Sequence, residues 1–310
     1  MAFEVFPVIH NAETQTLPTA LPQVCARIRG TCGELVQGTL DGLPCLVSCP
    51  IQRYNSVHLK TALHPGWVVP PQARKAADAL ALGLKLWGAP ASGGRLTLSS
   101  KLPPARGYAS STADIGATLF ALAALCGYDL SPYEAVRLAT RIEPSDGTFF
   151  EGLCLLDYQH AELVQPLGAA PALPLILIDP GGQVDTLAFN RQNHAEALSK
   201  LAPQHRFMFE LFIKALQMSD WMALGAAATL SARLHQPILF NPLLEKVLAL
   251  SADVHALGVC RAHSGTLLGV LLDPLRQDAA ETAAYLSRRL PGNIQIHIEQ
   301  LSGGGPYVEA

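Results

Sequence analysis

LPPARGYASSTADIGATLFALAAL, at residues 102–125, joins a strand-like run (95–99) to a helix through a loop of small and hydroxylated residues. The first turn of a helix offers N–H groups that lack internal partners, and the peptide dipoles favour negative charge there. Small residues let the backbone approach phosphate oxygens, and hydroxyls bond phosphate or magnesium. Residues 103–114 therefore predict a phosphate-binding loop, although Ser and Thr clusters also cap helices that bind no ligand.

Other site motifs do not occur in the sequence. The GK[ST] of a Walker loop, the GxGxxG dinucleotide fingerprint and the GxSxG elbow of a Ser-His-Asp hydrolase are all missing. The phosphate loop therefore belongs to another class of nucleotide site, and a hydrolase is not supported.

Around this loop, apolar periodicity and turn signals predict strands and helices in runs. Asp41-Gly42 indicates a hairpin turn, and Ser131 with Glu134 indicates a capping box. Runs of strands and of helices, without strict alternation, favour a two-layer α+β fold. We expect strands at 24–31, 43–49, 55–61, 95–99, 153–158, 173–178, 184–189, 258–261, 266–272 and 294–298, and helices at 72–87, 110–125, 132–142, within 193–257 with breaks at Pro203 and Pro237, and at 279–289.

Composition excludes several classes of protein. Of the 310 residues, 49% are apolar and 15% charged, so the whole chain is expected to fold around a large core. The net charge of −3 and the lack of a basic block argue against a nucleic-acid partner. No signal peptide or membrane-length apolar run is recognised, so we expect a cytoplasmic protein with no membrane partner.

The seven cysteines are scattered and form no CxxC pair. Free thiols in a reducing compartment are the favoured interpretation. A zinc site built from Cys32, Cys45 and Cys49 is the alternative, although structural zinc sites need closer pairs.

Residues 103–113 resemble the phosphate-loop motif PPxxGLGSSxA of the GHMP kinases, a family that includes galacto-, homoserine, mevalonate and phosphomevalonate kinases. Tyr108 stands where the motif has Leu, and Ala109 where it has a second Gly. Ala109 is small enough to keep the loop open, but it fits without backbone strain only if its φ is negative. GTCGELVQG (30–38) resembles the first family motif, a strand entering a turn that ends in Gly-Glu. CRAHSGTLLGV (260–270) resembles the third, two strands around a Ser-Gly turn.

The resemblance implies a fold with an N-terminal, ATP-binding, ribosomal-S5-like half (1–168) and a C-terminal, ferredoxin-like half (169–310), divided where Pro, Gly and Ala cluster. It implies ATP and Mg²⁺ as cofactors. The phosphate-binding residues would be Pro104, Arg106, Gly107, Tyr108, Ala109, Ser110, Ser111 and Thr112.

The resemblance also implies catalytic roles for residues in IEPSDG (142–147). Glu143 would hold magnesium together with Ser111. Asp146 would take the proton of the substrate hydroxyl, or only orient that hydroxyl. Without the family, Glu-Pro-Ser-Asp is typical of a solvated turn.

RGTCGELVQG, GYASSTADI, IEPSDGTFF and VDTLAFN are most similar to the branch of the family that makes L-threonine O-3-phosphate for the aminopropanol linker of cobalamin. An acid such as Glu34 or Asp185 would pair the ammonium of the acceptor. His263 is either a hydrogen-bonded structural residue or part of this pocket. The expected substrate-binding residues are Glu34, Gln37, Asp146, Asp185, His263, Ser264 and Gly265.

Two other interpretations stay open. A homoserine kinase or another small-alcohol kinase would differ only in the acceptor pocket. A nucleotide-binding module without catalysis would keep the loop and lose the catalytic groups, yet Ser111, Glu143 and Asp146 are all present. A homodimer is possible, but no interface is identified.

Overall fold

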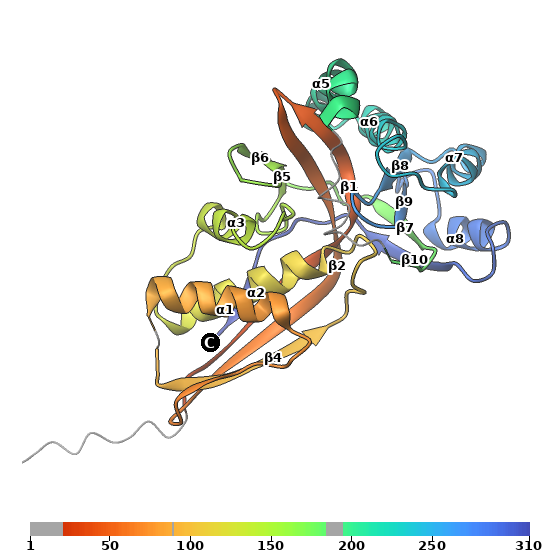
Figure 1. Cartoon of the computed structure of the whole chain (residues 1–310). Coiled ribbons are helices and arrows are strands. Elements are labelled where there is room, and N and C mark those ends of the chain that lie inside the picture. Colours follow the sequence, from red (N-terminus) through yellow and green to blue (C-terminus); the bar gives the residue numbers. More distant parts are fainter. Residues whose placement is uncertain (1–20, 89, 184–194) are drawn as a thin grey trace, which may run out of the picture.

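The computed structural model describes residues 21–88, 90–183 and 195–310, which build one sheet with helices packed against it (Figure 1). The sheet of these residues has eleven strands, and its main path runs β10-β7-β9-β8-β1-β2-β4-β3. The strands are β1 (Gln23–Leu40), β2 (Leu43–Ala62), β3 (Gly66–Val68), β4 (Gly93–Ser100), β5 (Leu153–Asp157), β6 (Val164–Gly168), β7 (Pro174–Asp179), β8 (Gly258–Arg261), β9 (Leu268–Leu271), β10 (Gln295–Gln300) and β11 (Tyr307–Glu309). The helices are α1 (Arg74–Trp87), α2 (Ser110–Leu125), α3 (Pro132–Thr140), α5 (Ala195–Met218), α6 (Trp221–Leu234), α7 (Leu244–Asp253) and α8 (Ala279–Ser287).

The long β1–β2 hairpin runs through the molecule, and the other elements are arranged along it (Figure 1). Helices α1 and α2 lie side by side over β1, β2 and β4, while α5 and α6 pack near the tip of the hairpin. Helix α2 is buried on almost every side, which explains why it is apolar all round. These features confirm the predicted α+β class.

The hairpin turn and the capping box predicted from neighbouring residues are confirmed. The Asp41-Gly42 turn has positive φ at both residues, 52° and 83°, and closes the hairpin as expected. The capping box of α3 is formed, since Ser131 accepts from the N–H of Glu134 and the Glu134 carboxylate accepts from the N–H of Ser131. Pro132 follows at the first helical position.

Several boundaries predicted from the sequence were wrong. The runs at 43–49 and 55–61 are one strand, β2, and β3, β6 and β11 were missed. Pro203 lies inside α5; the break falls at Ser219, where φ is 54° and Asp220 caps α6. The break at Pro237 is confirmed, because α6 ends at Leu234 and α7 begins at Leu244. The strand expected at 184–189 lies outside the described residues.

The first motif is part of β1 and is not a strand that ends in a turn, which corrects the expectation for residues 30–38. Its pairing with β2 shifts register between Arg29 and Val36, and Gly33 has φ of 61°. Such irregularities turn side chains of one strand toward a new face. At this point Glu34 pairs with Arg261, so that β1 joins β8 and the sheet continues across the proposed division at 168/169. That division stays a prediction.

Gly33→Ala is expected to destabilise the protein by about 3 kcal/mol, the sum of a left-handed backbone and an overpacked contact. A Cβ at Gly33 would lie 2.4 Å from the backbone nitrogen of Ala262. Gly42→Ala is the matched control, because Gly42 also has positive φ but has no atom within 4 Å of an added Cβ. Its expected loss is about 1 kcal/mol. Urea unfolding measures the free energy of unfolding of both variants. Equal losses of stability would contradict a steric role for the contact with Ala262.

Two groups of buried apolar residues form the core. The larger one joins α1 and α2 to β1 and β2 and continues to α5 and α6. The smaller one lies under α7 and α8 against β7 and β9. Among the helices of the described residues, none is long and apolar enough to span a bilayer.

All seven cysteines are free thiols, as expected. Across residues 21–88, 90–183 and 195–310, no cluster of three His, Cys, Asp or Glu residues is suited to a metal ion. The zinc alternative for Cys32, Cys45 and Cys49 is therefore wrong. Their thiols belong to the buried core instead.

Candidate active site

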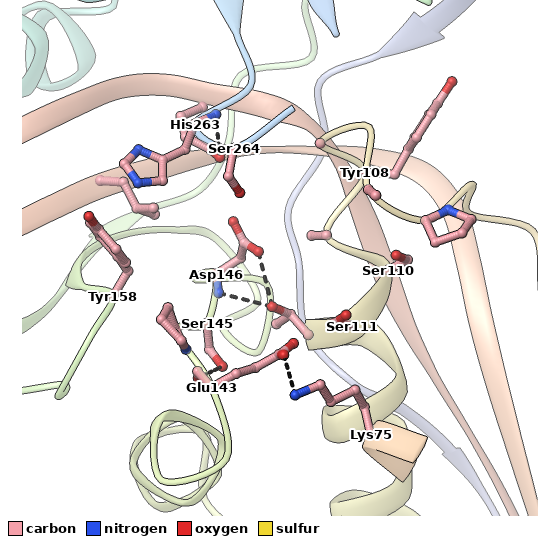
Figure 2. A pocket seen from close by; sticks show the side chains of 18 residues that line it. Lys75, Tyr108, Ser110, Ser111, Glu143, Ser145, Asp146, Tyr158, His263 and Ser264 are labelled. Atoms are coloured by element: carbon pink, nitrogen blue, oxygen red, sulfur yellow. Dashed lines mark hydrogen bonds and ion pairs between the residues drawn. The ribbon is translucent and has the colours of Figure 1, made fainter. Parts of the chain in front are cut away.

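A cleft of about 330 Å³ opens at the start of α2, where the three sequence motifs meet. It is lined by the phosphate loop, by the 143–146 turn and by side chains from α1, β1, β2 and the third motif (Figure 2). The lining residues are Glu34, Leu46, Lys75, Pro104, Ala105, Gly107, Tyr108, Ala109, Ser110, Ser111, Thr112, Glu143, Pro144, Ser145, Asp146, Tyr158, His263 and Ser264. Most of the expected site residues thus surround one cavity.

Backbone hydrogen bonds from the other two motifs hold the phosphate loop. In the first motif, the N–H of Thr31 donates to the Tyr108 carbonyl (3.0 Å) and that of Gly33 to the Gly107 carbonyl (3.1 Å). In the third motif, the N–H of Thr266 donates to the Arg106 carbonyl (2.9 Å). The loop is therefore fixed from both sides before any ligand binds.

The start of α2 has the features of an anion site. Its N-cap residue is Ala109, and no side chain caps the helix there. Because the first-turn N–H groups of a helix have no internal acceptor, this terminus suits phosphate oxygens. The ordinary capping interpretation of the Ser and Thr cluster is not supported, since the cap position carries no hydroxyl.

Ala109 corrects one expectation, because its φ is 56° and not negative. A left-handed backbone costs a residue with a Cβ about 1 kcal/mol, a cost that glycine avoids. Gly107 has φ of 104°, and a Cβ there would lie 2.3 Å from the Cβ of Ala262. The sequence keeps glycine at position 107, where an added Cβ would be crowded.

The side chains of Arg106 and Tyr108 are directed to Asp179 at the end of β7. Arg106 Nη1 and the Tyr108 hydroxyl each donate to Asp179 Oδ2 at 3.0 Å, and the N–H of Gly181 donates to Oδ1 (2.8 Å). Burial, followed by the charge of Asp179, raises the pKa of Tyr108. Figure 2 shows Tyr108 turned away from Ser110 and Asp146. Both side chains thus support the loop through Asp179 and are not directed into the cleft.

Asp146 is held by two hydroxyls from distant elements. Thr112 donates to Oδ2 (3.0 Å) and Ser48 to Oδ1 (3.3 Å). The N–H of Asp146 donates in turn to the Thr112 hydroxyl at 3.2 Å. Burial raises the pKa of Asp146 to about 6, against the opposing effect of these hydrogen bonds. Sequence reasoning missed Ser48, which lies in an apolar run with no motif of its own.

Glu143 forms an ion pair with Lys75, whose Nζ lies 2.6 Å from Oε2 (Figure 2). The carboxylate is 13% exposed, and the Ser111 hydroxyl lines the same cleft. One carboxylate and one hydroxyl are suitable ligands for magnesium, which keeps several of its waters and is coordinated also by substrate phosphates. They are too few for a metal whose ligands must all come from the protein. Lys75 was missed; its only signal is a basic residue in the first turn after Pro70-Pro71.

Glu34 also lines the cleft and is 5% exposed. Its Oε1 accepts from the N–H of His263 at 3.4 Å, and its Oε2 has no hydrogen-bond partner among the described residues. Burial first, and then the charge of Asp146, raise the pKa of Glu34 well above its ordinary value. A buried carboxylate oxygen on the wall of a polar cleft is a candidate site for a ligand cation.

The third motif contributes His263 and Ser264 to the cleft wall. His263 Nδ1 lies 2.6 Å from Oε1 of Gln37, and the His263 ring packs 4.7 Å from that of Tyr158. Gln37 itself does not line the cleft; it also donates to the Arg261 carbonyl (3.3 Å) and so orients His263.

One other expected residue, Gly265, is not on the cleft wall. Gly265 packs against the Arg106 carbonyl, which an added Cβ would approach to 2.2 Å. Asp185 lies outside the described residues. The roles of all these residues stay predictions.

Comparisons with known proteins agree with the motifs. The family described as GHMP kinases N terminal domain matches residues 73–151. An L-threonine kinase of Citrobacter freundii is 34% identical over 256 residues, which cover 82% of this chain and 88% of that protein. An L-threonine kinase of Salmonella typhimurium is 32% identical over 85% of this chain and 88% of its own length.

The fold is also similar to that of solved structures. A homoserine kinase from Cytophaga hutchinsonii superposes with a TM-score of 0.72 at 18% identity, over 96% of this chain and all of that one. At this identity the likeness concerns the fold alone. With the phosphate loop at the head of α2, the two flanking motifs and relatives above 30% identity over most of the chain, this protein belongs to the GHMP kinase family and is a small-molecule kinase.

Proposed function

We propose that this kinase transfers the γ-phosphoryl group of ATP to the side-chain hydroxyl of L-threonine, with Mg²⁺, and that the L-threonine O-3-phosphate formed supplies the aminopropanol linker of cobalamin. The observation that carries the acceptor class is the buried Glu34 carboxylate with its unpartnered oxygen in the cleft that Asp146 also lines. An ammonium is the group that such an oxygen would bind. The relatives named L-threonine kinase support the same acceptor.

In this proposal different residues bind the phosphates, hold the metal and accept the proton. The N–H groups at the start of α2 bind phosphate oxygens of ATP, and Glu143 with Ser111 holds magnesium, which neutralises charge on the transferring group when bound. Asp146, with a pKa of about 6, is ionised at neutral pH and accepts the proton of the acceptor hydroxyl. Thr112 and Ser48 fix its carboxylate toward the cleft.

ADP release with magnesium and ATP tests the acceptor. L-threonine, L-serine, L-homoserine, mevalonate and 3-hydroxybutyrate would be compared, the last because it keeps the hydroxyl and carboxylate of threonine without the ammonium. We expect L-threonine to have the highest kcat/KM. The values for mevalonate and 3-hydroxybutyrate should be lower by tenfold or more, since these two acceptors offer Glu34 no ammonium. Preference for L-homoserine would keep the mechanism and replace the acceptor. ATP binding without turnover on any of them would support the non-catalytic alternative.

A further inference from the structure

Lys75 is the only Lys or Arg on the cleft wall, within the part of the chain that the structure describes. It lies in the first turn of α1, and its side chain is 29% exposed. Arg106, the basic residue of the phosphate loop, is engaged by Asp179 instead. Lys75 lies outside the three sequence motifs at residues 30–38, 103–113 and 260–270.

The charges of the cleft show why this ammonium matters. Glu34, Glu143 and Asp146 all line it, so its walls carry three carboxyl groups against one ammonium. A nucleotide triphosphate adds several negative charges to this wall, and transfer of its terminal group requires their neutralisation. Beside the proposed magnesium ion, Lys75 is the cation that the described cleft wall supplies.

The position of Lys75 indicates which of the three phosphates of ATP it would contact. Its Nζ lies 2.6 Å from Glu143, and the charge of Glu143 in turn acts on Asp146. The transferring phosphoryl group must lie between the metal ligand and the group that accepts the hydroxyl proton. In the proposed complex Lys75, which pairs with Glu143, would therefore lie beside the γ-phosphate, and the loop N–H groups would bind the other phosphates.

We propose that Lys75 is a further catalytic residue, which contacts the γ-phosphoryl oxygens during transfer; this inference rests on the proposed function. A magnesium ion held by Glu143 would compete with Lys75 for the same carboxylate, which would leave the Lys75 ammonium available to the phosphate. In the transfer itself the bond from Pγ to the β,γ-bridging oxygen breaks, a bond from Pγ to the acceptor oxygen forms, and the hydroxyl proton passes to Asp146.

The test compares Lys75→Ala with Arg74→Ala, an exposed cationic neighbour on the same helix that does not line the cleft. We expect Lys75→Ala to lower kcat by about 100-fold, the usual effect of losing one donor to transition-state charge. Calorimetry with magnesium should show at least tenfold weaker binding of a β,γ-imido ATP analogue and less than threefold change for ADP. Lys75→Arg should recover part of kcat, and Arg74→Ala should resemble the parent protein.

Three results would overturn this role. Equal losses of affinity for ADP and for the ATP analogue would indicate that Lys75 contacts the α- or β-phosphate. Recovery of kcat in Lys75→Ala by excess magnesium would indicate that Lys75 only orients Glu143. Turnover within threefold of Arg74→Ala would remove it from catalysis. If the parent protein itself turns over no acceptor, the proposed function fails, whereas the analogue-against-ADP comparison still tests Lys75.

Discussion

Asp146→Asn should lower kcat by about 10³-fold while the affinity for ADP changes less than threefold, because the variant loses a proton acceptor and no nucleotide contact. Asparagine is isosteric and its oxygen still accepts from Thr112 or Ser48, which hold Asp146 at 3.0 and 3.3 Å. Steady-state ADP release and calorimetry measure the two quantities. Turnover near that of the parent protein would remove Asp146 from the mechanism and leave it as a structural residue.

The pH dependence gives an independent check on the same residue. Burial raises the pKa of Asp146 to about 6, so kcat/KM of the parent protein should fall below about pH 6 as the carboxyl takes up a proton. The ionised form is disfavoured in the folded state relative to the unfolded chain, where an Asp ionises near 3.9. Ionisation therefore costs stability above pH 6, and this cost disappears as the pH falls from 6 toward 4. Asp146→Asn should accordingly be more stable than the parent at pH 7, with a smaller difference at pH 4, measured by urea unfolding.

Glu34→Gln should lower kcat/KM for L-threonine by about 10³-fold, because removing one partner of a buried charge pair costs several kcal/mol. The amide still accepts from the N–H of His263, so the third motif keeps its contact at 3.4 Å. ADP affinity should not change. Glu162→Gln, at an exposed position outside the cleft, is the matched control.

The sharper readout of the same variant is specificity. The preference of the parent for L-threonine over 3-hydroxybutyrate should nearly vanish in Glu34→Gln, since the two acceptors differ by the ammonium that Glu34 would bind. Binding of L-threonine to the parent should also release protons, because the incoming cation lowers the raised pKa of Glu34. Calorimetry in buffers of different ionisation enthalpy measures this release. An unchanged preference would place the ammonium elsewhere in the cleft.

The amino-acid sequence was sufficient for the features that depend on short-range chemistry. The phosphate loop is visible because small residues, hydroxyls and the helix that follows are contiguous, and α2 begins at Ser110 as expected. The capping box at Ser131 and the Asp41-Gly42 turn involve residues at most three apart. Each of these depends on backbone conformations that a few neighbouring residues set by themselves.

Contacts between distant segments could not be predicted in the same way. Ser48 and Asp146 are 98 residues apart and Arg106 and Asp179 are 73 apart, so no local pattern marks either pair. The sequence assigned Arg106 to phosphate, but a buried carboxylate on β7 attracts its side chain. Lys75 gave only a weak signal, because its ion pair with Glu143 joins residues 68 positions apart and depends on the packing of α1 beside α2.

The sequence by itself determined the kinase family, the α+β class and the position of the phosphate loop, because these are fixed by motifs whose residues are neighbours in the chain. Only the tertiary structure decided the left-handed backbone of Ala109, the raised pKa of Asp146 and the unpartnered oxygen of Glu34. The pKa of Asp146 and the unpartnered oxygen of Glu34 depend on burial by segments far away in the chain, and the loop around Ala109 is held by backbone hydrogen bonds from Thr31 and Gly33. Burial and such long-range contacts are properties of the packed molecule, not of any stretch of sequence.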